Sequence, residues 1–186
     1  MLGEKNDESL PICPMSISSI QAGRIICELS GWRTSNLRLQ KLLYIACMNF
    51  IGTDTSNPRL LIRQDFEAWK YGPVEPNLYN FCSDFGSSDI TNVFPYERIK
   101  DDYPKEYEML EFIVNWGRNK TPGYLLGYTH KKKWAWYRTK RLPEKVVIPY
   151  SEIQRDYILE KEREDAEREK AIREEVKAAT DAGAET

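Results

Sequence analysis

The chain has 186 residues, of which 41% are hydrophobic, 12% aromatic and 30% charged. This composition is typical of one globular domain with an appended segment, and it excludes the weakly hydrophobic class of disordered proteins. The net charge is −2 and the pI is near 5.7, so no overall positive field attracts nucleic acid or an anionic membrane. Any such binding requires a local patch.

The cysteines and the apolar runs exclude further classes of protein. Cys13, Cys27, Cys47 and Cys82 never form a CxxC pair, so the sequence predicts free thiols and neither a zinc site nor a thioredoxin-like motif. No apolar run approaches the ~18 residues of a membrane span, and the N-terminus lacks the pattern of a signal peptide. We therefore expect a cytoplasmic protein that binds no metal and no membrane.

Two helices are expected in the first third of the chain. Residues 1–15 lack periodicity and predict a flexible arm, after which apolar residues at helical spacing predict a helix over 17–29 that ends before Gly31. Capping candidates at 34–36 then precede a second stripe of apolar residues at offsets of three and four, formed by Leu39, Leu42, Leu43, Ala46 and Phe50. This stripe is the clearest helical signal in the sequence.

The middle of the chain predicts a small β element between helices. Residues 60–69 tend towards alternation and predict a short strand, and Gly72-Pro73 interrupts it before Pro76 begins a helix that ends at Gly86. Residues 90–96 predict a second strand that pairs with the first, and further helices are expected from Pro104 and over 122–127. The expected fold is mainly α (α+β), a compact helical domain with a small β-hairpin element.

The last part of the chain differs in composition. Residues 160–177 contain almost no large apolar side chain, but opposite charges lie four apart, as in Glu164 with Arg168. This spacing predicts an extended, solvated and charged C-terminal helix, and the absence of a heptad pattern argues against a coiled coil. Docking of this helix on a partner is the alternative. We therefore divide the chain into an arm (1–15), a domain (16–150) and a charged tail (151–186).

Three segments carry a resemblance to a known family. They are NLRLQKLLYIA at 36–46, FEAWKYGPVEPNLYNF at 66–81 and YTHKKKWAW at 128–136. Together they resemble the Panacea domain of SocA-like antitoxins, which include phage-associated GepA-type proteins, over roughly residues 17–140. The resemblance implies an antitoxin that neutralises a cognate protein toxin by direct binding, without a cofactor or a catalytic centre. An adaptor that delivers the toxin to a ClpXP-type AAA+ protease is a second possibility within the same family.

Most residues that match the family pattern are expected to be structural. We expect Gln40 and Lys41 to bond the backbone of the strand that contains Glu67, and Gly72 to adopt a positive φ in a turn. His130 is the single histidine and no nucleophile elbow accompanies it, so we interpret it as a cap or hydrogen-bonding residue of a protein that is not an enzyme. The full set is Leu39, Gln40, Lys41, Tyr44, Glu67, Trp69, Gly72, Pro73, Pro76, Tyr79, Thr129 and His130.

The stretch KKKWAWYRTKR at 131–141 has three interpretations. Alternating basic and aromatic residues suit nucleic acid and would make a DNA-binding regulator, whereas an amphipathic helix would turn Trp134 and Tyr137 to the core. A basic surface with aromatic anchors also suits an acidic protein partner. The family often has an acidic residue and fewer lysines after its Thr-His pair. The candidate partner-binding residues are Lys132, Lys133, Trp134, Trp136, Tyr137, Arg138, Lys140 and Arg141.

Overall fold

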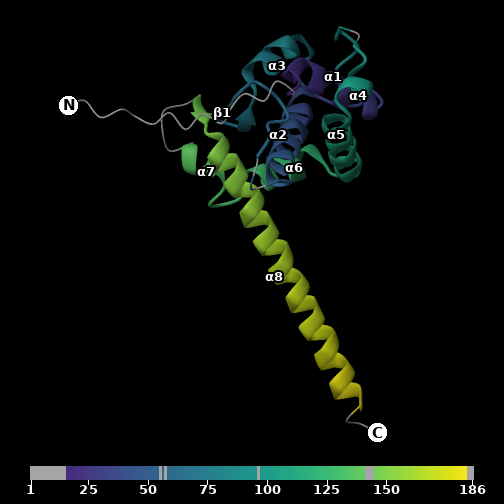
Figure 1. Ribbon diagram of the computed structural model, residues 1–186, viewed down its shortest axis with the longest axis vertical. Coiled ribbons are helices and arrows are strands. Elements are labelled where there is room, and N and C mark those ends of the chain that lie inside the picture. The colour runs from purple at the N-terminus through teal and green to yellow at the C-terminus, as the bar shows by residue number, and fades with distance from the viewer. Residues whose placement is uncertain (1–15, 55, 57, 96, 141–144, 184–186) are drawn as a thin grey trace, which may run out of the picture.

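The computed structural model describes residues 16–54, 56, 58–95, 97–140 and 145–183. The fold is mainly helical with one small sheet, and Figure 1 shows the helices gathered around α2 while α8 leads away from them. The elements in chain order are α1 (Ser19–Leu29), α2 (Asn36–Gly52), β1 (Phe66–Trp69), β2 (Gly72–Val74), α3 (Pro76–Phe81), the 3₁₀ turn η1 (Ser83–Phe85), α4 (Ile99–Asp102), α5 (Pro104–Gly117), α6 (Pro122–Thr129), α7 (Ala135–Thr139), β3 (Val146–Ile148) and α8 (Tyr150–Gly183). The predicted arm 1–15 and Arg141 lie outside the described residues.

Helix α2 is the centre of the core. Its N-cap is Ser35, whose side chain accepts a hydrogen bond from the backbone N–H of Arg38, as the capping candidates predicted. The predicted apolar stripe is buried, but Ile45 and Met48 on other faces are buried as well. The reason is that α1, α5, α6, α8 and β2 all pack against α2. Because most of α2 is covered by these elements, several of its polar residues, including Lys41, lie inside the protein.

The helix boundaries follow their capping residues. Helix α1 begins after Ser18, which forms a capping box with Gln21, so it starts two residues later than predicted. Pro76, Pro104 and Pro122 open α3, α5 and α6 in the first turn, where the missing N–H of proline has no cost. The predicted helix from Pro76 is shorter, because α3 ends at Phe81 and the 3₁₀ turn η1 follows it.

The sheet corrects one prediction. Strand β1 is shorter than the predicted 60–69 and pairs antiparallel with β2 and with β3, in the order β2-β1-β3. The expected second strand at 90–96 is wrong for its described residues 90–95, since the backbone N–H of Ile90 bonds the Thr34 carbonyl instead. Gly72-Pro73 does not end the β element but belongs to β2. Because β2 is an edge strand, it tolerates the missing N–H of Pro73.

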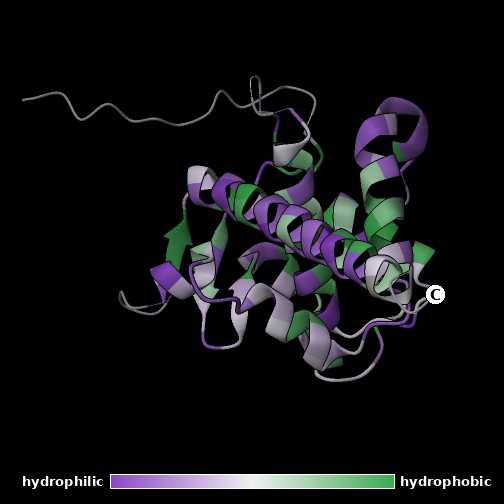
Figure 2. Cartoon of the chain, turned by 90° about the horizontal axis from the view of Figure 1, so that it is seen from below, coloured by the Kyte–Doolittle hydropathy of each residue, from purple (hydrophilic) through white to green (hydrophobic). Residues whose placement is uncertain are grey.

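Helix α8 has two unlike halves. Ile153, Asp156 and Glu160 are buried against the domain, and the helix packs on α2 and α7 in this part. Residues 165–180 are exposed, and in Figure 2 the hydrophilic colour dominates the helix that leads to the C-terminus. The predicted charged helix is therefore present, and its first turns belong to the core. No helix of the described residues is long and apolar enough to span a membrane.

Candidate functional site

The family-pattern residues meet where α2 touches the β1–β2 hairpin. The Nζ atom of Lys41 donates to the carbonyl of Pro73 over 2.9 Å, and the Oε1 atom of Gln40 accepts from the backbone N–H of Glu75 over 2.8 Å. These bonds go to β2 and the residue after it, not to the strand of Glu67 as expected. They tie the centre of α2 to the hairpin and support a structural role for both side chains.

Gly72 is required at this junction. Its φ is +104°, which matches the predicted positive φ. A Cβ atom at this position would lie 2.5 Å from Nζ of Lys41 and 2.9 Å from Nε2 of His130. Both the backbone conformation and the close approach of two side chains therefore exclude a larger residue.

His130 is packed and uncharged at neutral pH. Its backbone N–H bonds the carbonyls of Leu126 and Gly127 and caps α6, and its ring stacks on Trp136 with 3.7 Å between ring centres. Burial, and then the charges of Lys41 and Lys140, lower the pKa of His130 to about 4. This cap uses the backbone of His130 and not its ring. A ring in this environment is a poor general base near pH 7.

Other residues of the family pattern support the same junction. Burial lowers the pKa of Lys41 to about 7. The hydroxyl of Thr129 donates to backbone carbonyls of its own helix, α6. The indole of Trp69 donates to Glu67 over 2.8 Å and its ring lies 4.9 Å from that of Tyr79. Leu39 is buried, Pro76 begins α3, and Tyr44 reaches α8.

Asp156 fixes the first turns of α8 to the core. Its Oδ2 atom accepts from the hydroxyl of Tyr44 and its Oδ1 atom accepts from the backbone N–H of Ala135, each over 2.7 Å. Arg138 lies 3.6 Å from the same carboxylate. Burial raises the pKa of Asp156 to about 7, against the effect of its hydrogen bonds. One buried carboxylate thus joins α2, α7 and α8.

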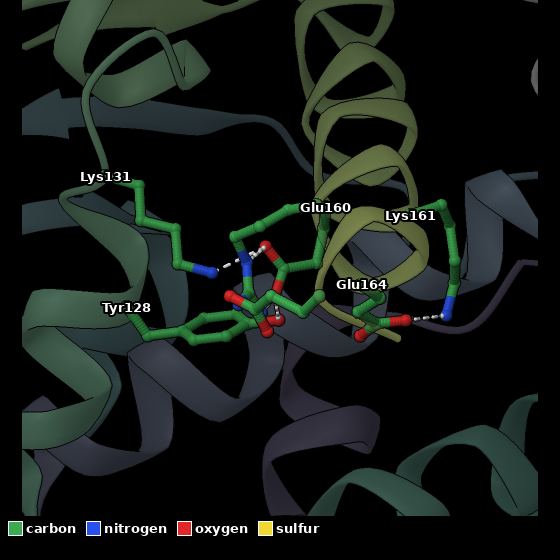
Figure 3. A network of polar contacts seen from close by, with 7 residues as sticks. Tyr128, Lys131, Glu160, Lys161 and Glu164 are labelled. Atoms are coloured by element: carbon green, nitrogen blue, oxygen red, sulfur yellow. Dashed lines mark hydrogen bonds and ion pairs between the residues drawn. The ribbon is translucent and has the colours of Figure 1, made fainter. Parts of the chain in front are cut away.

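Glu160 makes a second attachment one turn further along α8. Figure 3 shows its carboxylate between Tyr128, whose hydroxyl donates over 2.9 Å, and Lys131, whose Nζ lies 2.5 Å away. Arg163 adds hydrogen bonds from the same helix. Burial acts to raise the pKa of Glu160, but hydrogen bonds from Arg163, Lys131 and Tyr128 outweigh it and lower the pKa to about 2. The charged form is therefore strongly favoured.

Sequence reasoning missed both carboxylates. Apolar residues at helical spacing are the usual sign of a buried helix face, whereas the buried stripe of α8 consists of Ile153, Asp156 and Glu160. Offsets of three and four are the spacing of one helix face, so the signal was present in polar residues. The same contact explains Lys131, which departs from the family pattern and pairs with Glu160.

The basic stretch is divided between the core and the surface. Trp134 and Trp136 are buried at 3% and 5% exposure, so the structure places both predicted contact residues in the core. The indole of Trp136 donates to the carbonyl of Trp69. Arg138 bonds Glu152, and exposed Lys140 lies over the rings of Trp136 and Tyr137. Tyr137 and Arg138 are half-buried.

The exposed part of this stretch lines a concave surface with α8. The surface has a volume of about 550 Å³, and we call it the α7–α8 hollow. Its lining residues are Lys132, Lys133, Tyr137, Arg138, Arg155 and Leu159. Lys132, Lys133 and Arg155 are exposed cations, and the lining within the described chain includes no carboxylate. The hollow combines positive charge with an aromatic and an aliphatic side chain.

The comparison with known proteins decides the family. The sequence profile described as "Antitoxin SocA-like, Panacea domain" matches residues 39–137. The chain belongs to this family. The match includes α2 from Leu39 onward, the β1–β2 hairpin and the first three residues of α7. It therefore contains the three hallmark segments except for residues 36–38, and it ends before the charged tail. Among the described residues, no group of three or more His, Cys, Asp or Glu side chains is arranged to bind a metal ion.

One curated protein supports the assignment. Antitoxin SocA of Caulobacter vibrioides (strain NA1000 / CB15N) is 48% identical to this Panacea-domain chain over 58 residues. The aligned part covers 31% of this chain and 29% of that protein, so the match spans less than a third of the relative. No solved structure matches the chain.

Proposed function

We propose that this chain is an antitoxin that neutralises a cognate protein toxin by direct binding, with the α7–α8 hollow and the exposed face of α8 as its contact surface. Membership of the SocA-like family supports the antitoxin role. The observation that carries the choice of surface is the hollow itself, which Lys132, Lys133 and Arg155 line together with Tyr137. Positive charge around an aromatic anchor suits an acidic protein surface.

The anchoring of α8 supports the same surface. Asp156 and Glu160 fix the base of the helix, so the exposed turns beyond it project from the domain in a defined direction (Figure 1). A toxin bound in the hollow would therefore meet this helix too. Masking a toxin requires contact area and no chemistry, so the proposal assigns no residue a catalytic role.

We place this interaction in the cytoplasm. Cys27, Cys47 and Cys82 are buried free thiols, and burial raises the pKa of Cys27 to about 12 and that of Cys82 to about 11. Protonated thiols in apolar surroundings are unreactive, which suits a reducing compartment.

Co-expression tests the proposal. The neighbouring reading frame is expressed alone and with this chain, growth is measured, and complexes are purified from the rescued culture. We expect toxicity that this chain relieves, together with a stable complex. Replacing Lys132 and Lys133 by Glu should weaken the complex by about tenfold or more, because rim charges now repel an acidic partner. The matched control replaces Lys100 and Lys105, which are exposed on α4 and α5.

The other outcomes separate the alternatives. Rescue without a complex and with falling toxin levels would overturn masking and favour an adaptor for a AAA+ protease. Duplex DNA binding with a steep salt dependence, lost in the Lys132 and Lys133 variant, would favour a regulator. Equal weakening by the control variant would overturn the assignment of the surface, and absence of toxicity would contradict the antitoxin role.

A further inference from the structure

A second concave surface lies beside the β1–β2 hairpin, and it shares no lining residue with the α7–α8 hollow. It has a volume of about 670 Å³ and is bordered by the N-terminal half of α2, the hairpin turn, α3 and the turn after α3. We call it the hairpin groove. Its size is that of a typical ligand site.

The walls of the hairpin groove are aromatic and aliphatic. Trp69 and Tyr79 pack with their ring centres 4.9 Å apart, and both line the groove. Tyr71 in the hairpin turn is 61% exposed and Leu37 on α2 is 39% exposed. Large apolar side chains left in contact with water inside a concave surface are typical of a site that a partner covers.

Two buried amides in the groove each leave one polar atom without a hydrogen bond. The Nδ2 atom of Asn36 donates to the carbonyl of Tyr79, and its Oδ1 atom is unpaired in the described chain. Gln40 accepts from the N–H of Glu75 through Oε1, and its Nε2 atom is unpaired there as well. The bonds that are made fix both amide orientations. A flipped Asn36 would place its oxygen against the Tyr79 carbonyl, and a flipped Gln40 would place its NH₂ group against the N–H of Glu75. The residues are 3% and 1% exposed.

These two atoms form a matched pair. Asn36 and Gln40 lie four residues apart on α2, and therefore on one face of the helix. The α2 wall thus leaves one acceptor and one donor unpaired on one helix face, just beneath the surface of the groove in the free chain, and unpaired buried polar atoms cost about 1 to 3 kcal/mol each. A residue in an extended chain presents its own N–H and C=O to the same side, as in a hydrogen-bonded pair of antiparallel strands. An extended peptide toward which these side chains shift would supply both missing partners.

The charge of the groove selects the side chains of that peptide. Lys41 is buried in the wall, and Lys70 and Lys145 are exposed at the rim. The Nζ atoms of the two rim lysines lie over aromatic rings, Lys70 over Tyr71 and Lys145 over Trp69. Within the described chain, the lining of the groove contains no carboxylate. The groove therefore favours an acidic side chain next to an apolar one.

We propose that the hairpin groove binds an extended peptide segment of a partner protein. On binding, the side chains of Asn36 and Gln40 shift toward the segment, so that one of its residues donates its N–H to Oδ1 of Asn36 and accepts from Nε2 of Gln40. A neighbouring aromatic or large aliphatic side chain packs on Trp69 and Tyr79, and an acidic side chain pairs with Lys70 or Lys145. This goes beyond the proposed function, because the site is separate from the α7–α8 hollow and requires no toxin.

Peptide selection on the full chain tests the proposal. Random heptapeptides displayed on phage are selected against the purified protein, and the consensus is synthesised with a fluorescein label for anisotropy. We expect a consensus with Asp or Glu beside an aromatic or large aliphatic residue. Replacing Lys70 and Lys145 by Glu should raise its Kd by about tenfold or more. The variant of Lys100 and Lys105 makes the same charge change elsewhere and should leave the Kd unchanged.

A methyl scan of the peptide backbone tests the amide contacts without altering the protein. N-methylation at one position should abolish binding, because it removes the N–H that Asn36 accepts. A consensus that is basic or absent, equal weakening by both protein variants, or tolerance of N-methylation at every position would overturn the proposal. Competition by free phenylacetate at the concentration of the peptide would also overturn it, in favour of a small-molecule site. The toxin is absent from all of these binding experiments, so their outcome does not depend on the proposed antitoxin function.

Discussion

The two halves of α8 both carry acidic side chains but place them in opposite surroundings. Near its base, Asp156 and Glu160 are buried and their carboxylates bond three other elements, α2, α6 and α7, as well as the loop before α7. Beyond residue 164, acidic residues such as Glu169 are exposed and bond only along the helix. Aspartate and glutamate side chains thus attach the helix to the domain in one half, whereas in the other half they are exposed to water. Burial, and not charge, decides their energetic weight.

The largest difference between the halves is expected for aspartate. Asp156→Ala leaves the hydroxyl of Tyr44 and the N–H of Ala135 without their acceptor, and should lower the free energy of unfolding by about 3 kcal/mol. Asp165→Ala, an exposed change on the same helix, should alter it by less than about 0.5 kcal/mol. Urea denaturation followed by circular dichroism measures both. Equal effects of the two substitutions would remove the distinction between the halves.

The two buried carboxylates should give opposite pH dependence. The folded protein binds the proton of Asp156 more tightly than the unfolded chain, so its contribution to stability falls as pH rises from about 4 to 7. For Glu160 the unfolded chain binds the proton more tightly, so its contribution is lost as pH falls from about 4.5 to 2. Each effect should reach about 2 kcal/mol, allowing for solvent near the site.

Isosteric amides separate these two effects. Asp156→Asn should remove the decline between pH 4 and 7, and Glu160→Gln should remove the loss below pH 4.5. The urea midpoint of each variant is compared with that of the unaltered chain at steps of pH. If the pH dependence of the urea midpoint changed below pH 4 for Asp156→Asn, or above pH 4.5 for Glu160→Gln, another ionisable group would be responsible for it.

Truncation of α8 locates the boundary between its buried half and its exposed half. Ending the chain after Leu159 removes Glu160 and should cost about 2 kcal/mol, because Tyr128 and Lys131 lose their charged acceptor. Ending it after Lys170 removes only exposed turns and should leave the melting temperature unchanged. Thermal denaturation of the two truncated chains makes the comparison. A large loss from the shorter deletion would mean that the distal half contributes to the fold.

The smallest effect is expected for a single ion pair in the distal half. Glu169→Gln breaks the pair with Arg173, which lies 3.3 Å away on an exposed helix face. Such pairs contribute about 0.3 kcal/mol and are screened by salt. The helical signal of the distal half should fall slightly at low ionic strength and not at 1 M salt. A salt-independent loss would indicate a contact other than this ion pair.

The sequence predicted helices better than the contacts between them. Periodicity and caps located α1, α2 and α5, because both signals are local. The two partners of β1 are hard to recognise in the sequence. Strand β3 at Val146–Ile148 lies far along the chain, and β2 contains Gly72-Pro73, which is a turn signal and not a strand signal. The pairing of a short strand depends on the tertiary structure and not on its own sequence. The prediction that residues 90–96 pair with β1 rested on local strand propensity alone.

The candidate surfaces were predicted less completely for a related reason. The hallmark residues and the basic stretch were visible in the sequence, but burial divided the stretch and removed Trp134 and Trp136 from the surface. Arg155 and Leu159 join the α7–α8 hollow from α8, and no spacing rule connects them with Lys132. The groove depends on which amide atoms stay unpaired, a property of three-dimensional packing that one-dimensional patterns do not contain.

Hydrogen–deuterium exchange on the chain alone and in its complex with the toxin would locate the surface that binds the toxin. We expect added protection of backbone amides in residues 131–140 and in α8 from Arg155 onward, because in the proposed complex the toxin covers the α7–α8 hollow and the exposed helix. A stable complex that leaves the exchange of both segments unchanged, with protection elsewhere, would contradict the claim that this surface binds the toxin.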